Sequence, residues 1–464
     1  MRTKIIVIGC SALLVVVFLA YVLKERAFSY DYDNGADYCY SFDSSYAKIV
    51  NVAVKNSIVQ LPHLDNNYNT ALIEIKLQQN IVGYILQPEI KMLYDTLYLS
   101  QDFEYGARGT RYLNVSACIQ NNSKTITLDC SRCSLADGTY KLIMYKNRDI
   151  KKEHVLVLSP HPDDAEIAAY GLYSSTKNTF IATITAGDAG KSKYENFYNS
   201  DSEHYLQKGK LRVWNSITVP FLADLDPQNI VNLGYFDGSL KFMYFNDTLT
   251  TTSKFIGTKD IYIFRSKNIS TFLNSMKAVS NWHSLVNDLK YILKKRNPTI
   301  IVTPYPAIDT HYDHKCTSLA LFQAMKELHY TDAELWMYTN HYSKSDLYPV
   351  GEMGSATSLP PHFKTPWVFF DKIYSHPLSK NVQIEKLFAL DAMNDLRHNT
   401  EWNTIGDMFQ ILFKKLTDNF FQHENSYYRK SIRSNELFFV AKASTIYDDT
   451  NYKKIVGDIN QSDE

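Results

Sequence analysis

An uninterrupted apolar run, Val155-Leu156-Val157-Leu158, is the feature that most constrains what this chain can fold into. A strand with one solvated face alternates apolar and polar residues, whereas a strand covered on both faces is apolar throughout. Similar runs recur at residues 180–184 and 299–302, and apolar residues at helical spacing lie between them, from Trp282 to Ile292. Alternating strands and helices predict a layered, Rossmann-like α/β domain with a mostly parallel sheet.

Upstream of residue 153 the apolar residues have period two. Ile73, Ile75 and Leu77 share one face of a predicted strand, and charged residues occupy the other face. Short alternating runs separated by turns predict a β-sandwich, which would bind a glycan, dimerise, or act as a spacer. A chain of 464 residues is also too long for one core. We therefore expect an N-terminal helix over 1–26, the sandwich over 27–150, the α/β domain over 151–445 and a polar tail over 446–464.

The N-terminus carries a membrane signal. Arg2 and Lys4 precede an apolar run from Ile5 to Leu23, which is long enough to cross a hydrocarbon core of ~30 Å as a helix. No small-residue cleavage site follows it, so we expect an uncleaved transmembrane helix. The basic residues at the very start favour a cytoplasmic N-terminus. The soluble domains are then expected on the extracytoplasmic side, periplasmic or lumenal.

Charge and cysteine content narrow the possible partners. The chain has 49 basic and 49 acidic residues and no basic run, which argues against nucleic acid as a partner. Four of its six cysteines fall between residues 39 and 133. That distribution suits an exported domain with one or two disulfides, although plain thiols remain an alternative. The composition predicts no oligomeric state.

Two clusters of histidine and aspartate follow predicted strands. Pro160-His161-Pro162-Asp163-Asp164 comes directly after the first strand, and Asp309-Thr310-His311-Tyr312-Asp313-His314 comes shortly after the strand at 299–302. In open α/β sheets ligands bind beyond the carboxyl ends of the strands. Three protein ligands with a fourth position left open are typical of catalytic metal sites. Helix N-capping is the structural alternative for Asp163 and Asp313.

The two clusters resemble those of a known family. The stretch from His154 to Ala169 is similar to the opening strand and metal motif of the PIG-L/LmbE-like deacetylases, and 309–314 resembles their D-x-H-x-D-H motif. Weaker similarities lie at 185–190, 235–238, 386–394 and 436–438, so the resemblance covers roughly residues 152–445. The departures are Ala165, the segment 168–171, an insertion at 241–280 and Met393-Asn394-Asp395, and none of them is a metal ligand.

The resemblance implies a role for each residue of the clusters. His161, Asp164 and His314 would hold Zn²⁺, although this donor set also suits another divalent transition metal such as iron or cobalt. Asp163 would be the general base and His311 would stabilise the oxyanion. Asp313 would orient His311 or His314. Asp188 and Asp237, on neighbouring loops, would line a sugar pocket.

The resemblance therefore implies zinc-dependent hydrolytic deacetylation of an N-acetylated amino sugar of the N-acetylglucosamine type. With a membrane helix at the N-terminus, the expected substrate is an envelope glycan, a glycolipid or a lipopolysaccharide precursor. One alternative is a membrane-tethered glycan-binding protein whose deacetylase-like domain is inactive, but the full set of ligands and the base disfavour it. A deacetylase of a small soluble metabolite is another, which a tether disfavours.

Overall fold

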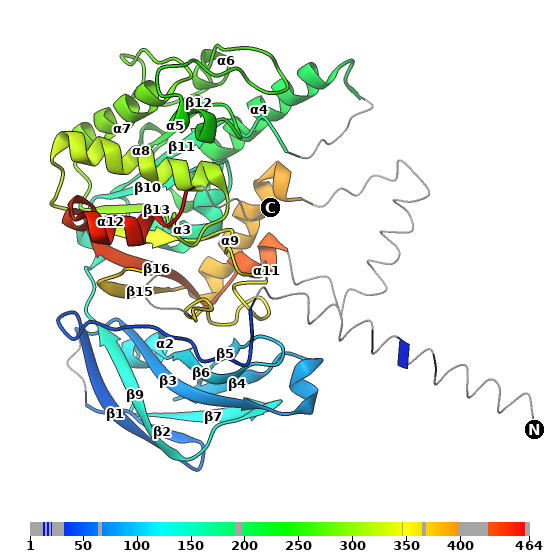
Figure 1. The fold of residues 1–464 in the computed structure, drawn as a ribbon, viewed down its shortest axis with the longest axis vertical. Helices are drawn as coiled ribbons and strands as arrows, with labels where there is room; N and C mark the ends of the chain where they lie inside the picture. The colour runs from blue at the N-terminus through cyan, green and yellow to red at the C-terminus, as the bar shows by residue number, and fades with distance from the viewer. Residues whose placement is uncertain are drawn as a thin grey trace, which may run out of the picture.

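The computed structural model describes residues 32–63, 67–190, 197–345, 347–363, 368–397 and 426–459, with Leu13, Val16, Val17 and Ala20. In this part of the chain the strands form two sheets, which lie one above the other in Figure 1. The upper sheet is flanked by helices, whereas the lower one is formed almost entirely by strands. The predicted membrane helix at 1–26 lies outside the described residues, apart from the four isolated positions. Among the described residues, no helix is both long and apolar enough to span a bilayer.

The upper sheet is mixed rather than uniformly parallel. Its order is β12-β11-β10-β13-β14-β16-β15; the first five strands pair in parallel, and β16 and β15 pair antiparallel. The strands are β10 (Val155–Ser159), β11 (Thr179–Thr185), β12 (Ile230–Tyr235), β13 (Ile300–Pro304), β14 (Glu334–Tyr338), β15 (Lys372–Pro377) and β16 (Asn435–Lys442). The expected α/β domain is therefore present, with two antiparallel strands added at one edge.

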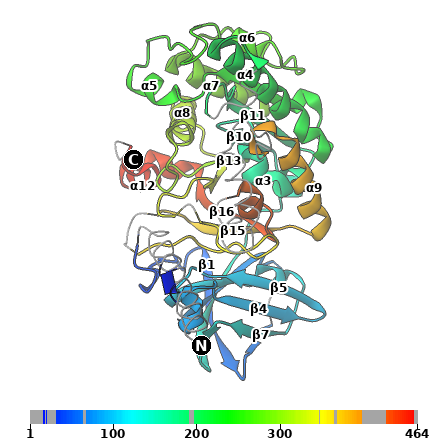
Figure 2. The ribbon, with the colours of Figure 1, turned by 90° about the vertical axis from the view of Figure 1, so that its right-hand side faces the viewer.

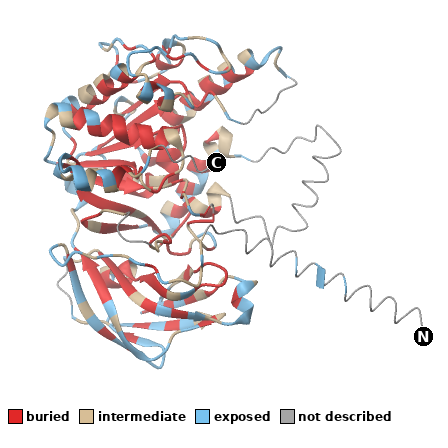
Figure 3. Ribbon diagram, viewed as in Figure 1, coloured by how far each residue is buried: buried red, intermediate tan, exposed pale blue. Residues whose placement is uncertain are grey.

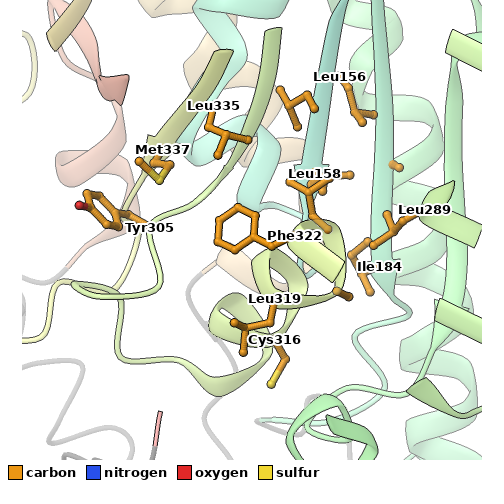
Figure 4. Packing of buried hydrophobic residues seen from close by; sticks show 14 of the residues in the cluster. Leu156, Leu158, Ile184, Leu289, Tyr305, Cys316, Leu319, Phe322, Leu335 and Met337 are labelled. Carbon is orange, nitrogen blue, oxygen red and sulfur yellow. The ribbon is translucent and has the colours of Figure 1, made fainter. Parts of the chain in front are cut away.

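Helices cover both faces of this sheet, which explains its apolar strands. Leu156 and Leu158 face α7 (Trp282–Arg296) and α8 (Tyr312–Leu328), as the packing in Figure 4 shows. Val155 and Val157 pack on the opposite face, in the same core as α3 (Asp164–Ser174) and α9 (Lys380–Ala392). Every residue of β10 is buried, as its red colour in Figure 3 indicates. Further helices are α4 (Asp201–Thr218), α5 (Leu240–Phe245), α6 (Tyr262–Arg265), α11 (Tyr427–Ser431) and α12 (Asp449–Val456).

The lower sheet is antiparallel and contains nine strands in the order β5-β4-β7-β2-β1-β9-β3-β6, with β8 paired to β3. The predicted sandwich is thus a single hydrogen-bonded sheet whose strands bury one shared apolar core. The strands are β1 (Ala47–Lys55), β2 (Ile58–Gln60), β3 (Thr70–Gln79), β4 (Glu89–Tyr94), β5 (Leu97–Asp102), β6 (Arg108–Asn114), β7 (Thr125–Ser131), β8 (Cys133–Ser134) and β9 (Gly138–Tyr145). The short helix α2 (Ser116–Gln120) follows β6. As predicted, Ile73, Ile75 and Leu77 all face the core.

Tertiary packing changes the expectation for the C-terminal segment. The predicted polar tail contains α12, whose Ile455 and Val456 are buried in the main core. Its apolar residues are too few to stand out in the composition, but their i, i+3, i+4 spacing with Tyr452 forms one helix face.

The five described cysteines are all free thiols, so the disulfide alternative is not the one seen in the structure.

Helix α3 is broken at the point where the sequence departs from the family pattern. Ala169 has non-helical angles of φ −144° and ψ 17°, which interrupts the helical hydrogen-bond ladder. The buried side chains of Lys386 and Glu436 fill that interruption. Lys386 Nζ donates to Ile167 O at 2.9 Å, and Glu436 accepts from Gly171 N at 2.8 Å. Because these two side chains also pair with each other at 2.8 Å, each broken backbone group keeps a partner.

We predict that Lys386→Met lowers the free energy of unfolding by about 3–5 kcal/mol, because it leaves Glu436 as a buried, unpaired carboxylate. Urea denaturation measures the loss. Lys386→Met combined with Glu436→Gln should recover part of it. Lys380→Met, at an exposed position of the same helix, should stay within about 0.5 kcal/mol of the wild type. Equal stability of the two single variants would contradict this account of the kink.

Candidate metal centre and active site

The loops that follow β10, β11, β12, β13 and β14 converge at the carboxyl edge of the parallel strands. They bring together His161 and Asp164 after β10, Asp237 after β12, and His311 and His314 after β13. This one cluster contains all six residues predicted for the site from sequence, together with residues of the neighbouring loops. The six are His161, Asp163, Asp164, His311, Asp313 and His314. The parallel register of the strands is the cause, because it aligns their carboxyl ends.

The turn after β10 is held in a strained shape. Asp163 has φ 132°, a value that non-glycine residues rarely adopt and that costs of order 1–3 kcal/mol. Ser159 Oγ supports the turn by donating to His161 O at 2.6 Å and accepting from Ala165 N at 3.1 Å. Helix α3 begins immediately afterwards. The strain lets consecutive aspartates point in different directions, Asp164 toward the histidines and Asp163 toward α4.

The Asp164 carboxylate lies between the two histidines predicted with it as metal ligands. Its Oδ2 is 3.1 Å from His161 Nδ1 and 3.1 Å from His314 Nε2. Burial alone would raise its pKa, but His314 and His161 outweigh that effect and hold the pKa of Asp164 well below its ordinary value. Asn340 Nδ2 donates to the other oxygen, Oδ1, at 2.7 Å. The carboxylate is therefore ionised and fixed in place.

The histidine at the centre of this cluster has one nitrogen prepared for a metal. His314 Nδ1 lies 3.1 Å from Asp309 Oδ2, an acceptor that holds a proton on Nδ1 and makes Nε2 the nitrogen available to a metal ion. Nε2 is completely buried and lies 3.1 Å from Asp164 Oδ2. Burial alone would lower the pKa of His314, but the carboxylates of Asp164 and Asp309 raise that pKa to about 10, so a metal ion bound at Nε2 would displace a proton. A buried nitrogen of this kind beside an ionised carboxylate fits a divalent metal ion.

Other donors lie close enough to join or replace the predicted ligands. Three sets of side chains each bring three ligand atoms within 4.8 Å of one another. They are His161, His311 and His314; Asp164, His314 and His341; and His161, Asp237 and Asp313. The donors are nitrogen and oxygen only, and such a mixture suits zinc, iron or cobalt better than magnesium or calcium.

Asp163 faces a buried cation instead of the histidines. Arg212, on α4, donates through Nη2 to Asp163 Oδ2 at 2.9 Å and to Pro162 O at 2.9 Å. Its other contacts include Asp237 at 3.8 Å and Asp395 at 3.5 Å. Burial raises the pKa of Asp163 to about 7, although Arg212 opposes the rise. The carboxylate is therefore poised to take up or release a proton near neutral pH.

His311 has a defined tautomer. It caps α8, and its Nδ1 accepts a hydrogen bond from Asp313 N at 3.2 Å. A backbone N–H can only donate, so the proton of the neutral ring lies on Nε2. Burial, with His161 and His314 as neighbours, lowers the pKa of His311 to about 4. A neutral, half-buried N–H donor thus stands beside His161, with ring centroids 4.7 Å apart.

The orienting role expected for Asp313 is divided: its backbone N–H holds His311, whereas another carboxylate holds His314. Asp309, quoted in the second motif but given no role there, is the carboxylate that orients His314. Asp313 Oδ2 lies 3.3 Å from His161 Nε2 and accepts from Gly238 N at 2.7 Å. Asp313 therefore ties the loop after β12 to the ring of His161. Asp237, from that same loop, lies 3.2 Å from His161 Nε2.

Sequence reasoning missed Arg212, Asn340 and His341. Arg212 lies in a helix whose other residues look like an ordinary amphipathic pattern, so no signal marks it. Asn340 and His341 follow a buried strand, as the two motifs do, and position alone could have indicated them. His341 lies beside His314, with ring centroids 4.9 Å apart.

We predict that Asp309→Asn weakens divalent metal binding about 10- to 100-fold, because the amide no longer fixes the tautomer of His314. Calorimetric titration of the metal-free protein with Zn²⁺ measures the change, and thermal melting checks that the fold is kept. Asp332→Asn, at an exposed position, is the control. Unchanged affinity in Asp309→Asn would show that Asp309 does not serve the metal.

A family model matches part of this chain. The PIG-L family model, described as GlcNAc-PI de-N-acetylase, matches residues 156–325, which include both clusters. A search of the curated proteins finds no match. Similar solved structures include a deacetylase of the teicoplanin biosynthetic pathway, 15% identical, covering 62% of this chain and 98% of that one, with a TM-score of 0.32.

Two further solved structures are similar at the same level. The A40926 pseudoaglycone deacetylase is 15% identical, covers 63% of this chain and 98% of its own, and has a TM-score of 0.32. A conserved protein of Thermus thermophilus is 14% identical, covers 62% and 94%, and has a TM-score of 0.29. At these identities and TM-scores the solved structures carry no argument about the activity of this chain. The family model assigns residues 156–325 of this chain to the PIG-L family.

Proposed function

We propose that this protein is a metal-dependent hydrolase that removes the acetyl group from an N-acetylated amino sugar. The observation that carries the proposal is the arrangement around Asp164 in a domain of the PIG-L family. A buried donor set for a metal lies on one side of the turn, and Asp163 lies next to it with a pKa near neutrality. Amide hydrolysis requires an electrophile and a base in that proximity.

His161, Asp164 and His314 would hold the ion, with His341 or Asp237 near enough to share in the coordination. A divalent metal there supplies Lewis-acid polarisation of the acetyl carbonyl and lowers the pKa of a water toward neutrality. Zinc is the proposed native ion.

The residues of this chain perform the proton transfers. Asp163 accepts the proton of the water that attacks the carbonyl carbon, and Arg212 holds its carboxylate in position. As the carbonyl oxygen gains negative charge, His311 donates a hydrogen bond to it from Nε2–H. When the C–N bond breaks, Asp163 returns its proton to the leaving amine. The products are acetate and a free amino group, so water is consumed and no other reactant is needed.

We propose an N-acetylglucosamine-type unit of an envelope glycan, glycolipid or lipopolysaccharide precursor as the substrate class. The family description names an acetylated glucosaminyl lipid as the substrate of that family, and the apolar run from Ile5 to Leu23 supports a membrane location for this chain. The soluble domains would then lie on the extracytoplasmic side. Protease protection of the full chain in intact cells tests that orientation.

We predict that Asp163→Asn lowers the rate of acetate release about 10²- to 10⁴-fold while the protein still binds its metal. The assay offers N-acetylglucosamine-containing glycolipids and oligosaccharides, with a chelator and with added zinc. Asp224→Asn, which changes an exposed carboxylate, should keep full activity. Chelator-insensitive release, or an active Asp163→Asn, would sink the proposed mechanism. A metal-loaded protein inactive on every glycan would favour the glycan-binding alternative.

His311→Ala should lower kcat about 10²- to 10³-fold with little change in KM, because the donor acts on charge that develops only in the transition state. His311→Gln keeps an N–H donor and should recover part of that loss. Because His311 caps α8, its replacement by alanine also removes that cap. Thermal melting is therefore measured beside the kinetics to separate a loss of stability from a loss of rate. An increase confined to KM would assign His311 to substrate binding instead.

A further inference from the structure

The β-domain carries an exposed apolar tip between β3 and β4. We use the name apolar tip for residues 81–86, which include the 3₁₀ helix η1 (Ile81–Tyr84). Ile81 is 83% exposed, Val82 44%, Tyr84 42% and Leu86 45%. Single exposed apolar residues are ordinary on protein surfaces, but four large ones within six positions form a contiguous patch.

The tip is held rigidly. The Asn80 side chain accepts hydrogen bonds from Val82 N at 3.0 Å and Gly83 N at 3.3 Å, and Asn80 N donates to Arg132 O. Gly83 O in turn accepts from Gly106 N at 2.9 Å. These bonds fix the backbone of the tip in the conformation that leaves its large apolar side chains exposed.

The tip lies where the N-terminal segment joins the domain. A Cβ atom placed on Gly106 would be 2.9 Å from Asn34 Nδ2 and 3.1 Å from Tyr84 Cε1, so Asn34 and Tyr84 flank the same glycine. Arg111 Nη2 fixes Asn34 there by donating to its carbonyl at 2.6 Å. From Leu23, the end of the apolar run, to Asn34 the chain can reach at most about 40 Å.

We propose that the apolar tip inserts into the interfacial layer of a lipid bilayer, the same bilayer that the apolar run at 5–23 is expected to enter. Apolar side chains with an adjacent tyrosine suit that layer, where acyl chains meet headgroups. The tip itself has no charged side chain, so its insertion does not require a charge to leave water. We choose a bilayer as the partner of the tip because the apolar run at 5–23, if it is anchored in a membrane, would hold the tip close to that membrane.

Contact with a bilayer would also orient the proposed active site. Helix α11 holds Tyr427 against His341, with ring centroids 6.0 Å apart, and therefore borders the site. Figure 1 shows the short blue helix η1 on the same side of the molecule as α11. Figure 2, turned to face that side, shows α9 above β4 and β5. A bilayer at the tip would therefore lie on the α11 side of the molecule (Figure 1). The relevance of that placement to a glycolipid substrate rests on the proposed function.

Tryptophan fluorescence of the full chain in phosphatidylcholine nanodiscs tests the insertion without any activity assay. Ile81→Trp places the probe on the tip, and Tyr98→Trp is the matched control. Tyr98 is 76% exposed and lies by the β4–β5 turn, at the end of those strands away from the tip. The extra emission of Ile81→Trp should shift to the blue and be lost when the lipids carry brominated acyl chains. The extra emission of Tyr98→Trp should stay at the wavelength of tryptophan in water and resist quenching.

Three results would overturn the proposal. Water-like, unquenched emission from Ile81→Trp would show that the tip stays in solvent. Blue-shifted emission that brominated lipids do not quench would show that protein covers the tip, either another segment of this chain or a second copy. Equal quenching of both probes would show that the β-domain lies on the bilayer without a preferred end. A failure of acetate release in the separate assay would leave each of these readings unchanged.

Discussion

Five aspartates are buried at one edge of the parallel sheet, and the rest of the site follows from the need to stabilise them. They are Asp163, Asp164, Asp188, Asp309 and Asp313. An unpaired buried carboxylate is costly, so each must have cations or N–H groups within reach. Arg212 pairs with Asp163, and two histidines lie against Asp164. Backbone N–H groups of the neighbouring loops serve the remaining three. A divalent ion would add the remaining positive charge where the carboxylates are closest.

The need to stabilise buried carboxylates also explains why the loops around the site are joined to one another by many hydrogen bonds. The loop after β12 is tied to Asp313 through the N–H groups of Gly238 and Leu240, and the loop after β14 is tied to Asp309 through Asn340 N. Behind them, the pair Lys386–Glu436 completes the broken ladder of α3. Each loop can therefore keep an irregular backbone at the site, because its polar groups find partners on another element.

Part of the fold and of the candidate site could be predicted from sequence, because the signals for strands and for the motifs that follow them lie within a few residues. Continuous apolar runs identified the strands β10, β11 and β13, and the histidine and aspartate clusters directly after them indicated the edge at which a site would form. The two antiparallel strands at the other edge, and the single folded sheet in place of two, depend on pairings between distant segments. Helix α12 was mistaken for a tail because three apolar residues in a polar segment matter only once a core is there to receive them.

By itself the sequence determined which chemical groups stand at the strand ends, since strand and turn propensities act over a few residues. Tertiary structure alone decided which groups meet. Arg212 reaches Asp163 from a helix whose rotation is set by its packing on the sheet. The choice of Asp309 over Asp313 as the partner of His314 depends on how α8 sits against the loop after β14. Such contacts are set by the relative placement of whole elements, which no short stretch of sequence encodes.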